Sequence, residues 1–65
     1  MVTKKRKLAP ESEARVKWNQ ASRRTKGLIL ERMAKDINPK DKGEVGYFYG
    51  NLYPKTRTAI RRYFA

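Results

Sequence analysis

The sequence predicts a small, mostly α-helical domain with three or four short helices in a helix–turn–helix-like arrangement. Two observations favour this fold class. Apolar residues recur at spacings of three and four along most of the chain, and prolines stand where helices would begin or end. A total of 65 residues allows one small domain with a thin core. Only residues 44–53 leave room for β-structure, as one short hairpin that would form a wing.

The chain divides into a short arm and a folded part. Residues 1–9 have no apolar periodicity and contain four basic and no acidic residues, so we expect a flexible basic arm. Residues 10–65 hold nearly all the large apolar side chains and form the single domain. The basic residues of the arm are Lys4, Lys5, Arg6 and Lys7.

The first helix is expected over residues 10–23. Pro10 suits the first helical position, and two glutamates follow it where the positive end of the helix dipole favours acids. Spacings of four and three place three side chains on one inward stripe. These are Ala14, Trp18 and Ala21.

The second helix is expected over residues 26–37, with Thr25 as its N-cap. Asn38-Pro39 should end it, because a residue before proline avoids the α-helical region. Five apolar residues fill one face of this helix and should belong to the core. They are Ile29, Leu30, Met33, Ala34 and Ile37.

Residues 44–53 fit two structures. A helix would place Val45, Phe48, Tyr49 and Leu52 on one face. A hairpin would alternate aromatic and small residues and turn at Gly50-Asn51, which suits a two-residue turn. Both interpretations stay open on sequence grounds.

The last helix should start at Pro54 and carries two different faces. At about 100° per residue, its apolar and basic side chains separate onto opposite arcs. The inner arc holds Thr56, Ala59, Ile60, Tyr63 and Phe64. The outer arc holds Lys55, Arg57, Thr58, Arg61 and Arg62. One side of this helix should therefore pack on the domain while the other faces an anionic partner.

The residue types argue against several classes of function. Without His or Cys, the chain lacks the commonest catalytic and metal-binding side chains, so we expect neither an enzyme nor a cofactor. No apolar run approaches the ~20 residues of a membrane span or the core of a signal peptide. The expected location is intracellular, in the cytoplasm or nucleoid, or in the nucleus of a eukaryote.

The net charge of +11 predicts an anionic partner, namely nucleic acid and above all duplex DNA. A helix over residues 42–50 would pair with the last helix as a helix–turn–helix, in a transcriptional regulator or an architectural, nucleoid-type protein. Residues 55–58 would then reach base edges, and Arg61 and Arg62 would hold phosphates. The candidate contacts are Lys4, Lys5, Arg6, Lys7, Arg23, Arg24, Lys26, Lys55, Thr56, Arg57, Thr58, Arg61 and Arg62.

Two other functions remain open. Tyr47, Tyr49 and Tyr53 could stack on bases, which would make the protein a binder of RNA or single-stranded nucleic acid. The same aromatic segment beside basic residues also suits a small inhibitor or adaptor that binds an acidic protein surface. A homodimer is a further expected arrangement, because one short helix contributes limited specificity.

Overall fold

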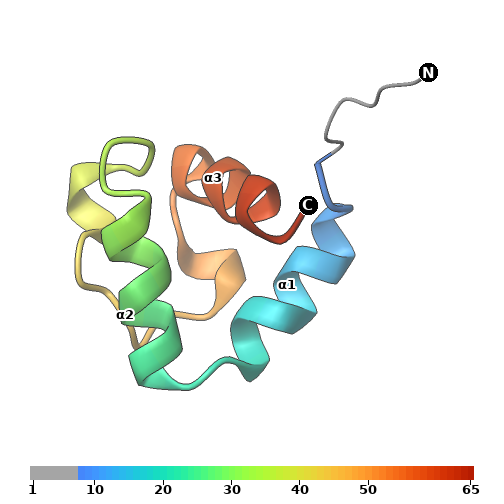
Figure 1. Ribbon diagram of the computed structural model, residues 1–65, viewed down its shortest axis with the longest axis horizontal. Helices are drawn as coiled ribbons and strands as arrows, with labels where there is room; N and C mark the ends of the chain where they lie inside the picture. Colours follow the sequence, from blue (N-terminus) through green and yellow to red (C-terminus); the bar gives the residue numbers. More distant parts are fainter. Residues whose placement is uncertain (1–7) are drawn as a thin grey trace.

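Three α-helices and two single-turn 3₁₀-helices make up residues 8–65, the part of the chain that the computed structural model describes (Figure 1). The elements are α1 (Glu11–Gln20), α2 (Arg23–Arg32), η1 (Pro39–Asp41), η2 (Tyr49–Asn51) and α3 (Pro54–Phe64). No strand occurs among these residues. The predicted fold class is confirmed as an all-α domain of three helices.

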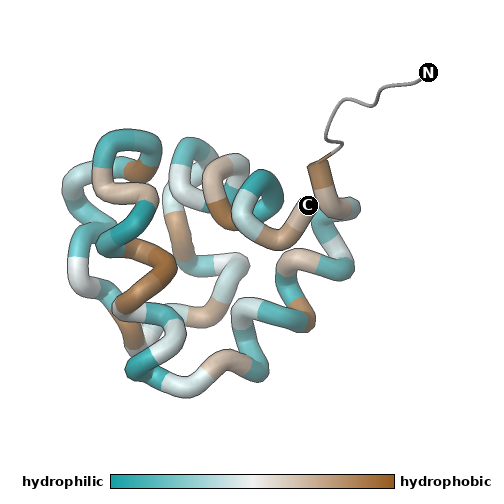
Figure 2. The backbone as a smooth tube through the Cα atoms, viewed as in Figure 1, coloured by the Kyte–Doolittle hydropathy of each residue, from teal (hydrophilic) through white to brown (hydrophobic). Residues whose placement is uncertain are grey.

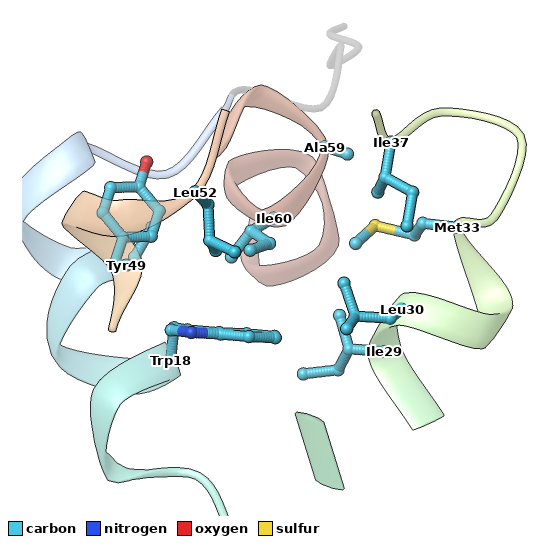
Figure 3. Packing of buried hydrophobic residues seen from close by; sticks show 10 residues of the cluster. Trp18, Ile29, Leu30, Met33, Ile37, Tyr49, Leu52, Ala59 and Ile60 are labelled. Atoms are coloured by element: carbon cyan, nitrogen blue, oxygen red, sulfur yellow. The ribbon is translucent and has the colours of Figure 1, made fainter. Parts of the chain in front are cut away.

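The core lies where the three helices and the loops between them meet (Figure 3). Trp18 from α1, Ile29 from α2 and Ile60 from α3 are fully buried. Loop and 3₁₀ residues complete the cluster, together with further helix residues. These are Ala14, Leu30, Met33, Ile37, Tyr49, Leu52 and Ala59. Figure 2 shows apolar and polar stretches alternating along the helices, as expected when each helix buries one face.

The first helix is shorter than predicted at both ends. Pro10 takes the N-cap position instead of the first helical one, and the helix ends at Gln20. Ala21 has an extended backbone and donates its N–H to the carbonyl of Trp18. Ala14 and Trp18 are buried as predicted, whereas Ala21 is only half-buried. The extended backbone at Ala21 lets the chain turn toward α2.

The second helix begins three residues earlier than predicted. Ser22, not Thr25, is the N-cap, and its Oγ accepts the N–H of Thr25 at 3.2 Å. Both residues have capping side chains, and the sequence did not distinguish them. Arg23, which was predicted to end the first helix, therefore lies with Lys26 in the first turn of α2.

The same helix ends at Arg32, five residues before the predicted end at Ile37. The chain continues through turns, which still bring Met33 and Ile37 into the core. Ala34 is exposed, so its place in the predicted core face was wrong. The apolar spacing of a helix thus persists into a segment that is no longer helical.

Residues 44–53 form neither the predicted helix nor the predicted hairpin, but turns followed by η2. Side chains of α1 hold the backbone of this segment. The indole Nε1 of Trp18 donates to the carbonyl of Tyr47 at 3.0 Å, and the N–H of Tyr49 donates to Oδ1 of Asn19 at 2.8 Å. These bonds satisfy backbone groups that a helix or a ladder would otherwise pair. The helix expected over 42–50, on which the helix–turn–helix prediction depended, is therefore absent.

The last helix starts at Pro54, as predicted, and a buried carboxylate supports its start. Asp41 is fully buried, and its Oδ2 accepts the N–H of Tyr53 at 3.1 Å and the hydroxyl of Thr56. The Thr56 Oγ1 in turn accepts the N–H of Asn38 at 3.0 Å. This network joins η1 to the first turn of α3 and compensates for the poor capping side chain of Tyr53.

The N-terminal segment packs on α3 at the point where the described chain begins. Ala9 is buried and donates its N–H to the carbonyl of Arg61 at 3.3 Å. Residues 1–7 of the predicted arm lie outside the described residues. None of the described helices is long and apolar enough to cross a membrane.

Candidate nucleic-acid interface

The outward face of α3 carries Lys55, Arg57, Arg61 and Arg62. Among the described α-helices, α3 is the one without an acidic residue. The side chains of Lys55 and Arg62 are exposed, whereas those of Arg57 and Arg61 are half-buried. Because Thr56, Ala59 and Ile60 pack inward, the cations lie on the opposite side of the helix.

One flank of this face borders a shallow depression of about 260 Å³ between α3 and the turn after α2. On the α3 side, the depression is lined by Lys55, Thr58, Ala59 and Arg62. Asp36 lies on the other side. Two cations and a hydroxyl can donate to a phosphate group. The carboxylate of Asp36 repels anions on its own side of the depression. A phosphate group is therefore favoured on the α3 side, next to the cations.

On the other flank, α1 approaches the same helix. Glu11 Oε1 lies 3.9 Å from Arg61 Nη1, and Arg61 Nη2 donates to the hydroxyl of Thr58 at 3.4 Å. Both charged side chains are partly exposed, so the ion pair is weak and screened by salt. Arg61 is therefore aimed along the surface, with its charge partly compensated by Glu11.

Two residues predicted to contact a partner belong to the core instead. Thr56 is fully buried and hydrogen-bonded to Asp41 and Asn38, so it cannot reach a base. Tyr49 is also fully buried, and its hydroxyl donates to the carbonyl of Arg57 at 3.4 Å. Thr56 lay on the inner arc of the predicted helix, so its own position in the pattern already indicated a core role.

The basic residues of α2 form a separate surface. Arg23 and Arg24 are exposed in the first turn of α2, which lies at the lower edge of Figure 1, whereas α3 lies at the upper edge. Lys26 is buried, and its Nζ lies 5.5 Å from the centre of the Trp18 ring. The predicted set therefore does not form one continuous site, and Lys4, Lys5, Arg6 and Lys7 lie outside the described residues.

The aromatic residues after Gly46 are divided between core and surface. Tyr47 and Tyr53 are exposed, as a stacking role requires. Phe48, which the helical pattern assigned to the core, is the most exposed large apolar side chain of the described residues. The run of three aromatic residues at 47–49 was the signal in the sequence that some of these rings are exposed. The thin core of so small a domain has no room for all three.

The described residues contain no group of three or more His, Cys, Asp or Glu side chains that could hold a metal ion. Comparison of the chain with protein-family models, curated proteins and solved structures finds no match. Charge, burial and contacts within this chain must therefore carry the assignment of function.

Proposed function

We propose that the protein binds nucleic acid, duplex DNA above all, by placing the outward face of α3 against the phosphate backbone. The observation that carries this proposal is the division of α3 into two faces. Its inner face is locked into the core by Ile60 and Thr56, while its outer face presents four cations and no acid. Cations held in place by a packed helix lose less freedom on binding than cations on a free tail.

The path of the N-terminal segment supports the same proposal. The hydrogen bond from Ala9 to the carbonyl of Arg61 brings the chain to the C-terminal half of α3. The basic residues 4–7 precede this point in the sequence and lie outside the described residues; we propose that they add contacts with phosphates.

The burial of Thr56 favours a binding mode that tolerates many base sequences. Phosphate contacts position a protein on DNA but do not identify bases. With Thr56 in the core, the first turns of α3 offer few side chains to base edges. An architectural, nucleoid-type role therefore suits the surface better than the role of a sequence-specific regulator.

The test removes two exposed cations from the depression and follows binding to a 20-base-pair duplex at several salt concentrations. The double variant Lys55→Gln plus Arg62→Gln should bind more weakly, and the slope of log K against log salt should fall in magnitude by about two. Both side chains are exposed, so its thermal unfolding should match that of the unaltered protein.

The matched control is the double variant Lys35→Gln plus Lys40→Gln, which removes the same charge from exposed positions outside α3. It should leave most of the salt dependence intact. Equal losses in the two double variants would show that only net charge matters and would remove α3 as the site. Binding that does not respond to salt would contradict the phosphate-binding mechanism itself.

A further inference from the structure

We infer that Phe48 and Arg23 form a second site, which stacks an unpaired base of single-stranded nucleic acid. This site is distinct from the α3 surface and goes beyond the proposed binding of duplex DNA. It consists of an exposed aromatic ring on a fixed backbone, with the guanidinium group of Arg23 close to the backbone two residues before that ring.

Phe48 is exposed to an extent that folding does not explain. Its exposed fraction is 63%, compared with 51% for Val16, the next most exposed large apolar side chain. Burying a phenylalanine side chain contributes roughly 1.5–3 kcal/mol to folding, and most of that contribution is absent here. An exposed ring is available to a ligand that covers it.

The backbone on both sides of Phe48 is fixed. The carbonyl of Tyr47 accepts the Trp18 indole N–H, and the N–H of Tyr49 donates to Asn19. The carbonyl of Phe48 itself accepts the N–H of Asn51 at 2.9 Å. Because the fully buried ring of Trp18 holds this segment, Phe48 is presented from a rigid support, which reduces the entropic cost of binding.

Arg23 supplies the positive charge of the site. Its Nη2 lies 3.9 Å from the position that a Cβ at Gly46 would occupy, two residues before Phe48. The guanidinium group therefore lies close to the backbone that carries Phe48. Single-strand binders combine cations that hold phosphates with aromatic rings that stack bases.

An unpaired base fits this site better than a base pair does. Bases within a duplex already stack on their neighbours, whereas a base in a single strand has a free face for an aromatic ring. The segment 46–48 also lies beside the start of α2, away from α3 in Figure 1. A duplex seated on α3 would therefore leave Phe48 uncovered.

The test compares Phe48→Ala with Val16→Ala, which shortens another exposed apolar side chain on α1. Binding of a 12-nucleotide oligothymidylate is measured by titration calorimetry, alongside the 20-base-pair duplex. Phe48→Ala should weaken single-strand binding about tenfold, without changing its salt slope, since stacking involves no phosphate. Phe48→Trp should retain the affinity, and duplex binding should change by less than about twofold.

The charge of the site is tested by Arg23→Gln, with Arg32→Gln at the far end of α2 as control. Only Arg23→Gln should reduce the single-strand salt slope, by about 0.7. The inference is overturned if Phe48→Ala behaves like Val16→Ala, or if it weakens duplex and single-strand binding equally. Either result leaves the α3 proposal standing, because that proposal depends on duplex binding by the variant that lacks Lys55 and Arg62.

Discussion

The starts of α2 and α3 differ in how each treats the positive end of the helix dipole. At α3, the buried carboxylate of Asp41 accepts the N–H of Tyr53 and the hydroxyl of Thr56. At α2, the first turn contains Arg23, Arg24 and Lys26 and no acidic residue, and only Ser22 caps it. One helix start is therefore built for stability, while the other keeps exposed cations at some cost in stability.

The first helix follows the usual charge preference at a helix start, unlike α2. Glu11 and Glu13 lie in the first turn of α1, where the dipole favours acids. Cations at that position of α2 are unfavourable by about 0.3–1 kcal/mol each at low salt. The contact between Lys26 and the Trp18 ring offsets part of that cost. Arg23 and Arg24 have no such compensation among the described contacts, which is consistent with retention for binding.

The largest difference between the two starts should appear on removal of Asp41. In Asp41→Ala, the N–H of Tyr53 and the buried hydroxyl of Thr56 lose their acceptor, at about 1–3 kcal/mol for each group. We expect the free energy of unfolding to fall by about 3 kcal/mol, measured by urea denaturation. The free energy of unfolding of a 65-residue domain is only about 3–10 kcal/mol, so a large fraction of the variant molecules would be unfolded.

Two further variants sharpen this measurement. Asp41→Asn keeps an acceptor oxygen and should retain most of the stability. Ser22→Ala removes the cap of α2 and should cost only about 1 kcal/mol. If Asp41→Ala and Ser22→Ala were equally destabilising, the network at α3 would contribute no more than an ordinary cap.

A smaller effect of opposite sign is expected at the start of α2. Arg24→Glu replaces an unfavourable charge by a favourable one in the first turn and should stabilise the protein by about 0.5 kcal/mol at low salt. The same change at the other end, Arg32→Glu, should destabilise it, because cations are preferred in the last turn. Thermal unfolding midpoints that shift in the same direction in both variants would show that the dipole does not determine the effect.

The smallest expected effect concerns Glu11 at the start of α1. Its carboxylate lies 3.9 Å from Arg61, so Glu11→Gln should release that guanidinium group for phosphates. We expect duplex affinity to rise about twofold at low salt, with a loss of stability below about 0.5 kcal/mol. The control is Glu31→Gln on α2, which removes the same charge away from α3. Equal gains in both variants would indicate a net-charge effect.

The sequence predicts α3 well and the middle of the chain poorly, for a physical reason. Pro54 and the two arcs that follow it are local signals, and they give the correct start and, apart from the exposed Tyr63, the correct faces. Residues 44–53 are held by Trp18 and Asn19, about 30 positions away in the chain, through their backbone groups. Within residues 44–53, these bonds use a backbone carbonyl and a backbone N–H, and every residue but proline carries both groups. The pattern of side chains in this segment therefore does not indicate them.

The predicted site shows the same division. Lys55, Arg57, Arg61 and Arg62 face outward because a helical period places them there. Thr56 and Tyr49 turned out to be core residues because both find buried polar partners, which residue type alone does not indicate. The exposure of Phe48 follows from the turn and 3₁₀ backbone of residues 44–53. Neither the helix nor the hairpin predicted for these residues has that backbone.

The environment of Trp18 gives the protein a built-in optical reporter. It is the only tryptophan in the chain, its ring is fully buried, and its indole N–H donates to Tyr47 next to Phe48. Its emission spectrum therefore reports on the segment 46–49. A ligand that displaces this segment would shift the emission, whereas one that settles on the far side of α3 would leave it unchanged. Binding at the two surfaces can thus be followed separately without any attached dye.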